Sequence, residues 1–152
     1  MFKFRFLIIS LLLIFISPFA TADLTVDSAW IREAPPISRV QAAYATFKNN
    51  SSKAIELIKV TSPAFNKIEF HQTIIKNGLT SMQEQSSIVI PAQGVAKLEP
   101  EGMHMMLFKP VVPLRAGDNV ALHLTLSSGK IIQSNFVVKK ATGTNHHQHM
   151  HH

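Results

Sequence analysis

Apolar and polar residues alternate over several short segments of the chain. In "VALHLTL" (120–126), the residues Leu122, Leu124 and Leu126 fall on one face if the segment is extended. Segments 24–30, 40–48 and 54–61 show the same two-residue period in whole or in part. "KIIQSNFVV" follows segment 120–126 after the turn "SSGK", which is typical of a hairpin. After residue 22 no stretch keeps a 3.6-residue period beyond two turns, so the pattern predicts strands and few or no long helices.

Glycines divide this pattern at regular intervals. The six glycines lie between positions 78 and 143, spaced 8 to 16 residues apart, and the segments between them are rich in β-branched and other apolar residues. Short strands separated by turns at such a spacing predict an all-β sandwich or barrel.

The two ends of the chain differ from its centre. Residues 1–22 combine two cations, an apolar run and the small residues Ala20-Thr21-Ala22, which is typical of a signal peptide cleaved after Ala22. The alternative is an uncleaved membrane anchor, but the run is shorter than the ~20 residues that a spanning helix needs. Residues 141–152, with five histidines among the last seven positions, are expected to form a flexible His/Met-rich tail. One domain, residues 23–140, remains between them.

Composition removes several chemistries. The chain has no cysteine, which excludes disulfides, thiol catalysis, haem attachment, a two-His, one-Cys blue-copper site and a lipoprotein anchored through a thiol. Without the two cations of residues 1–22, Lys+Arg falls from 15 to 13 against nine acids, a net charge of +4. These cations are scattered, so they give no nucleic-acid signature and argue only weakly for docking to an acidic surface.

A candidate metal site begins in "FHQTIIKNGLTSMQE" (70–84). Asn77-Gly78 is a strong hairpin signal, and a turn centred on it pairs His71 with Glu84 and Thr73 with Met82. His71 and Met82 then become diagonal neighbours on one face, about 7 Å apart at the backbone.

The segment "MHMMLF" (103–108) supplies a second pair. If it is extended, Met103, Met105 and Leu107 line one face and are expected in the core. His104 and Met106 share the other face with Phe108, which places an imidazole beside a thioether. A lone histidine such as His123 is interpreted as a partly exposed or hydrogen-bonded residue.

The chemistry of these side chains favours a soft ion. Thioether sulfur binds hard cations poorly and suits Cu(I), and neutral imidazole adds a stronger ligand that copper also accepts. Aspartates are few, so a hard-cation cage is not expected. From spacing alone, core packing of the methionines remains an open alternative to a metal site. Trp30 and Tyr44 are expected to fill the core.

The four residues resemble a known signature. Ten residues separate His71 from Met82, twenty-one separate Met82 from His104, and one separates His104 from Met106. This spacing is similar to that of the periplasmic copper chaperones of the PCu(A)C family. The resemblance extends over "AWIREAPP" (29–36), "AAYATFKN" (42–49), "IPAQGVAKLEPEGMHMMLF" (90–108), "PLRAGDNVALHLTL" (113–126) and the closing "FVV". One departure is Pro100-Glu101-Gly102, where family members commonly carry Pro-Gly-Gly.

The resemblance implies a cupredoxin-like Greek-key β-sandwich that binds Cu(I) in the periplasm through His71, Met82, His104 and Met106. It implies delivery of copper to the copper-centre subunit of cytochrome c oxidase, with a Sco-type thiol protein as a second partner. Some relatives end in a His/Met-rich extension, and clustered imidazoles bind Cu(II) readily. The tail is therefore expected to capture Cu(II) through His146, His147, His149, Met150, His151 and His152.

Other functions stay open. An electron-transfer cupredoxin conflicts with the absence of cysteine, and an exported structural or adhesive β-sandwich would need no metal at all. An enzyme is not expected, because the chain has no Gly-x-Ser-x-Gly elbow, no His-Glu-x-x-His and no phosphate-cradling glycine loop.

Overall fold

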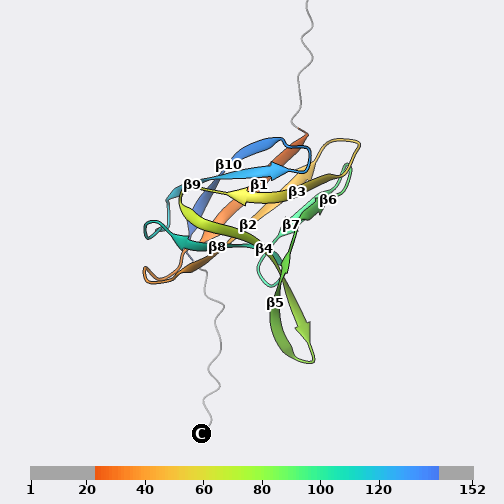
Figure 1. Cartoon of the computed structure of the whole chain (residues 1–152). Coiled ribbons are helices and arrows are strands. Elements are labelled where there is room, and N and C mark those ends of the chain that lie inside the picture. Colours follow the sequence, from red (N-terminus) through yellow and green to blue (C-terminus); the bar gives the residue numbers. More distant parts are fainter. Residues whose placement is uncertain (1–22, 141–152) are drawn as a thin grey trace, which may run out of the picture.

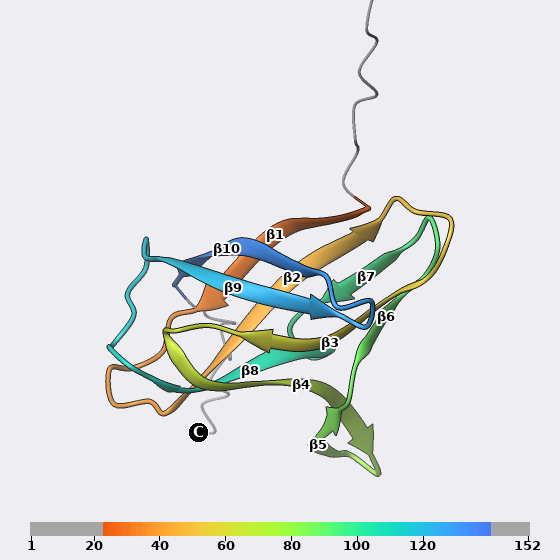
Figure 2. The same cartoon turned by 45° about the horizontal axis from the view of Figure 1, so that its top comes forward.

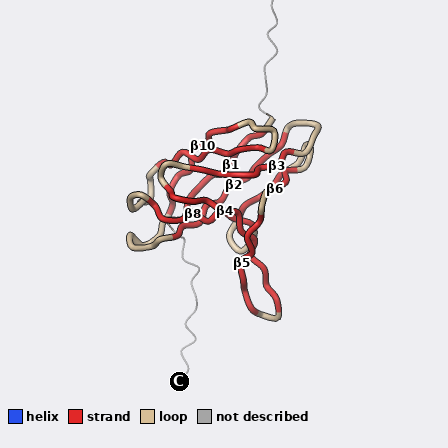
Figure 3. Tube along the Cα trace, viewed as in Figure 1, coloured by secondary structure: helices blue, strands red, loops and turns tan. Residues whose placement is uncertain are grey.

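The computed structural model describes residues 23–140. These residues form ten strands and no helix (Figure 3). The strands are β1 (Leu24–Arg32), β2 (Val40–Asn49), β3 (Ile55–Thr61), β4 (Phe65–Lys76), β5 (Leu79–Gln85), β6 (Ile88–Ile90), β7 (Val95–Leu98), β8 (Met103–Pro110), β9 (Asn119–Leu126) and β10 (Ile131–Lys139). No helix within residues 23–140 is long and apolar enough to cross a membrane.

The strands form one sheet that folds over on itself into a cupredoxin-like barrel. Its hydrogen-bonded order is β5-β4-β8-β2-β1-β10-β9-β3-β6, and β7 also pairs with β2. Among the described strands, β1 and β10 pair in parallel and the other neighbours are antiparallel. Figures 1 and 2 show the sheet wrapping around, with the β4–β5 hairpin projecting from the body. The all-β class expected from the alternating pattern is confirmed.

One apolar core closes the barrel. Phe47 of β2, Met105 of β8, Leu122 of β9 and Phe136 of β10 are fully buried in the same cluster. On β9 this burial follows from the alternation in segment 120–126, because every second residue there points inward. Burial of such large side chains contributes about 1.5–3 kcal/mol each relative to exposure.

The projecting hairpin has the register expected from its turn. Asn77 and Gly78 both have positive φ, at 53° and 75°, as the two-residue turn of a twisted hairpin requires. β4 and β5 pair His71 with Glu84 and Thr73 with Met82. The hairpin prediction is therefore confirmed at the level of single residue pairs.

Candidate metal centre

Two of the four predicted ligands lie directly opposite each other. β4 and β8 are antiparallel neighbours, and their register pairs His71 with His104. The two imidazole rings are 6.1 Å apart between centroids. Cross-strand partners point to the same side of a sheet, so both rings project from the outer face, opposite the core side of Met105. The β4–β8 pairing thus brings His71 and His104, which are 33 positions apart in the sequence, next to each other.

His104 is held in one orientation by the turn before it. Its Nδ1 lies 3.0 Å from the carbonyl oxygen of Gly102, which can only accept, so Nδ1 carries the proton and donates. The same carbonyl accepts a hydrogen bond from the backbone N–H of Thr73 at 3.1 Å, which ties this turn to the hairpin. His104 is 4% exposed and thus buried. The lone pair of this tautomer is on Nε2, which is the atom that can bind a metal.

His71 is oriented in a complementary way. Its Nε2 lies 2.8 Å from Oε2 of Glu69. The carboxylate fixes the proton on Nε2 and leaves the lone pair on Nδ1. Nδ1 is buried and has no hydrogen-bond partner within residues 23–140. A buried nitrogen without a partner is costly, and a metal ligand is one role that explains it.

Both methionines lie on the same face of the sheet as the two histidines. Met106 is the cross-strand partner of Glu69, and Met82 is the partner of Thr73. His71 therefore lies at the centre of a diagonal that runs from Met106 to Met82, with about 7–8 Å at each step. Met82 is 56% exposed on the projecting hairpin. A common ion for all four side chains requires the hairpin to curl toward β8.

Glu69 is a site residue that sequence reasoning missed. Its side chain also forms an ion pair with Lys67. Hydrogen bonds from Lys67 and then His71 lower the pKa of Glu69, so the carboxylate is ionised. This anion lies one hydrogen bond from His71, so a negative charge borders the candidate site although none of the four predicted ligands carries one. The pattern Glu69-x-His71 could have signalled it, because residues two apart on a strand share a face.

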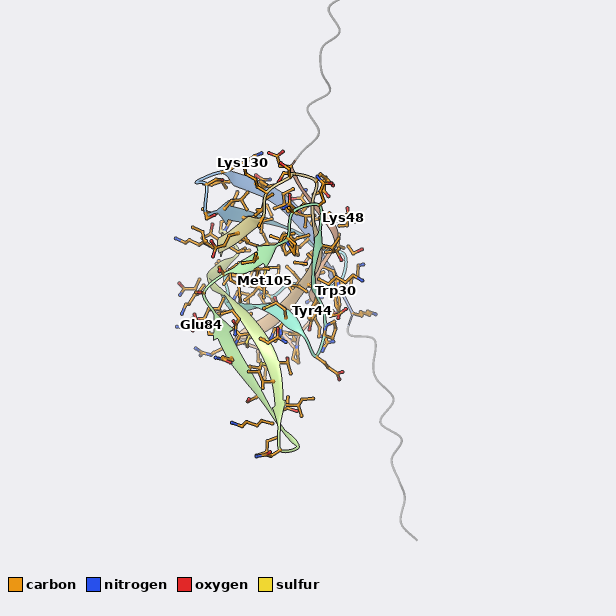
Figure 4. All side chains as sticks on the ribbon, turned by 90° about the vertical axis from the view of Figure 1, so that its right-hand side faces the viewer. Trp30, Tyr44, Lys48, Glu84, Met105 and Lys130 are labelled. Carbon is orange, nitrogen blue, oxygen red and sulfur yellow. The ribbon has the colours of Figure 1, made fainter. Side chains whose placement is uncertain are left out.

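Aromatic side chains border the site. Tyr44 of β2 lies 6.5 Å from the His104 ring between centroids, and Trp30 of β1 lies 4.6 Å from Tyr44. Tyr44 is buried as expected, but it lies outside the core cluster, on the opposite side of β2 from Ala43. Figure 4 shows Trp30 and Tyr44 together on the body of the fold and Glu84 on the projecting hairpin. Burial raises the pKa of Tyr44, and nearby Arg32 opposes this shift.

The six tail residues that are predicted to bind Cu(II), from His146 to His152, lie outside the described residues. His123 of β9 is half-buried and remote from the site in the strand order. Within residues 23–140 no group of three or more His, Asp or Glu side chains could hold a metal ion. Glu101, which replaces the middle glycine of Pro-Gly-Gly, has a φ of 66°.

Known proteins are similar to this chain in sequence and in fold. A family model described as "Putative lipoprotein LpqE-like" matches residues 24–138. "Putative lipoprotein Lxx21020" of Leifsonia xyli is 35% identical over 121 residues, 79% of this chain and 72% of that protein. The copper-bound PCuAC domain from PmoF2 has a TM-score of 0.68 at 17% identity, covering 81% of this chain and 97% of that domain, and this likeness shows the fold.

A further solved structure is similar in sequence as well. The solution structure of CuI-DR1885 from Deinococcus radiodurans is 29% identical, with a TM-score of 0.63, and covers 77% of this chain and 78% of that chain. The resemblance to the PCu(A)C family is thereby confirmed: the chain belongs to the LpqE-like family and folds as a PCuAC-type domain.

Proposed function

We propose that this protein is a periplasmic copper chaperone that carries Cu(I) in a site made by His71, Met82, His104 and Met106. The observation that supports it most is the pairing of His71 with His104. Each ring has one nitrogen bound to an oxygen acceptor and a second nitrogen left for a metal. Copper is the cargo of this site, exchanged with a partner through stepwise ligand replacement.

The donor set favours monovalent copper over zinc. Thioethers are soft, neutral ligands that Zn²⁺ and hard cations bind poorly, and imidazole strengthens the site without making it selective for zinc. Relatives agree with this assignment: the similar DR1885 has been solved with Cu(I), and PCuAC domains of the same fold are known in copper-bound and copper-free forms.

The wider setting is part of the proposal. Residues 1–22 act as a signal peptide, 23–140 as the copper domain and 141–152 as a tail that captures Cu(II). The acceptor is the copper-centre subunit of cytochrome c oxidase, with a Sco-type thiol protein as a second partner. Relatives described as lipoproteins are compatible with export.

Native mass spectrometry under reducing conditions tests the core of this proposal. For residues 23–140 we expect one Cu(I) and no retained Zn²⁺. His104→Asn should lose or strongly weaken Cu(I) binding, since it removes the buried imidazole. His123→Asn is the matched control on β9 and should retain the ion. Equal binding by both variants, or preference for Zn²⁺, would contradict the proposal.

The alternatives predict different results. A metal-free structural or adhesive β-sandwich predicts no Cu(I) adduct and no change of the protein on copper addition. An electron-transfer cupredoxin predicts a reversible one-electron couple with an intense visible band, which a site without cysteine should lack.

A further inference from the structure

Two loops and the last strand form one end of the barrel, here called the loop end. Loop 33–39 joins β1 to β2, and segment 109–118 leads from the end of β8 into β9. The carboxylate of Glu33 accepts a hydrogen bond from the backbone N–H of Ala116 at 3.0 Å, and the N–H of Glu33 donates to the carbonyl of Lys139 at 2.8 Å. Figures 1 and 2 show these loops at the end of the molecule away from the β4–β5 hairpin.

The loop end carries apolar side chains that contact little else. Ile37 is 91% exposed, Val111 is 71% exposed and Val112 is 58% exposed. Side chains this exposed stand out from the surface. Prolines at positions 35, 36, 110 and 113 restrict the backbone on both sides of them. Ile37 borders the same hollow as Pro110 and Pro113, which flank Val111 and Val112, so the three aliphatic side chains lie at one end of the barrel. Exposed apolar side chains grouped in this way mark an interaction surface.

Cations outnumber acids on the loop end, and Arg39 and Lys109 border the same hollow as Ile37. The backbone N–H of Lys109 donates to the carbonyl of Arg39 at 2.7 Å, so these two residues are neighbours. Two acids, Glu33 and Asp118, use a carboxylate oxygen to accept a backbone N–H. Five cations against these two acids leave a local charge of +3, and within residues 23–140 none of the five forms an ion pair. The five exposed cations are Arg39, Lys109, Arg115, Lys139 and Lys140.

We propose that the loop end binds the surface of an anionic lipid bilayer. Ile37, Val111 and Val112 would enter the headgroup region, and the surrounding cations would lie over lipid phosphates. Protruding aliphatic side chains fit a deformable bilayer, whereas an acidic protein would need a matching pocket for each of them. This attachment is peripheral and does not depend on the copper site, which lies on the outer face of β4 and β8.

Vesicle flotation tests the charge contribution. All ten strands and their core lie within residues 23–140, so a chain that starts at Asp23 keeps the whole fold and lacks the apolar leader. It should float with vesicles of phosphatidylglycerol and phosphatidylcholine at low salt and be released at about 1 M salt. Arg39→Glu/Lys109→Glu should weaken this binding by at least about tenfold. The control Lys59→Glu/Lys97→Glu makes the same charge change on exposed residues of β3 and β7 and should bind nearly as wild type.

A labelled residue tests the apolar contact. Because the chain has no cysteine, Ile37→Cys provides a single site for a polarity-sensitive fluorophore. Its emission should shift to shorter wavelength with the anionic vesicles and not with phosphatidylcholine alone. Ile75→Cys, 72% exposed near the hairpin turn, should show no shift.

Four results would overturn the bilayer proposal. The first is wild-type protein that stays unbound, and the second is equal loss of binding in both charge-reversal variants. The third is a fluorescence shift only at position 75. The fourth is binding of soluble polyglutamate without binding of vesicles, which would assign the loop end to an acidic protein.

Discussion

His71 and His104 are direct cross-strand partners on β4 and β8, with ring centroids 6.1 Å apart. Their backbone positions are set by sheet register, and their ring orientations are set by different oxygen atoms. Glu69 binds Nε2 of His71, and the carbonyl of Gly102 binds Nδ1 of His104. The two nitrogens that the proposed Cu(I) site would use are therefore held in place without a metal, which would reduce the entropy lost on binding.

Replacing Glu69 should weaken copper binding without removing a ligand. Glu69→Leu abolishes the acceptor that orients His71, and loss of such a partner typically costs tenfold or more in metal affinity. Glu69→Gln should fall between wild type and Leu, because its amide oxygen can still accept. The measurement is competition for Cu(I) with a chelator of known affinity.

Glu84 supplies the control for that experiment. It is the other cross-strand partner of His71 but is exposed, and no hydrogen bond joins it to His71 within the described residues. Glu84→Leu should leave the Cu(I) affinity close to that of wild type. If Glu69→Leu and Glu84→Leu lower the Cu(I) affinity equally, the loss comes from removing a negative charge and not from a change in the orientation of His71.

Copper should order the β4–β5 hairpin. Met82 lies at the far end of a diagonal through His71 to Met106, so an ion shared by all four side chains must draw the hairpin toward β8. Hydrogen exchange of the β5 amides should slow when Cu(I) is added to wild type. Met82→Leu should lose this protection and Met103→Leu should keep it, because Met103 packs against the core. Exchange that is unchanged by copper would remove Met82 from the site.

Glu101→Gly should stabilise the fold. Glu101 has a φ of 66°, a conformation that costs a residue with a Cβ about 1 kcal/mol and costs glycine almost nothing. The free energy of unfolding in urea should therefore rise by about 1 kcal/mol, partly offset by the greater entropy of unfolded glycine. Gly78→Ala is the opposite case, because the φ of 75° at this position favours glycine. This variant should lower the free energy of unfolding. A loss of stability in Glu101→Gly would show that strain at this turn is negligible.

The Tyr44 hydroxyl should ionise at a higher pH than that of an exposed tyrosine. Burial raises its pKa above the ordinary value of about 10. Because the folded state holds this proton more tightly than the unfolded state, the stabilisation is complete below the unfolded pKa and is lost as pH rises through the folded pKa. Tyr44 is the single tyrosine of the chain, so phenolate absorbance reports it alone. The folded protein should titrate at higher pH than the protein in urea, and coincident curves would contradict the burial.

Much of this fold could be predicted from local patterns, because strand faces and the Asn77-Gly78 turn depend on neighbouring residues. The turn fixed the β4–β5 register, and with it the shared face of His71 and Met82. The pairing of β4 with β8 depends on contacts between segments distant in sequence, so the direct opposition of His71 and His104 could not be derived from spacing. The hydrogen bond between Glu69 and His71 lies within β4, so the pattern Glu69-x-His71 could have predicted it.

X-ray absorption at the copper edge tests the central claim most directly. Residues 23–140 loaded with Cu(I) should show both nitrogen and sulfur scatterers, with sulfur supplied by Met82 and Met106. Met82→Leu/Met106→Leu keeps similar side-chain volume and should remove the sulfur signal, while Met103→Leu should leave it unchanged. A sulfur signal that survives in the double variant, or that is missing from wild type, would contradict a site built from these two histidines and two methionines.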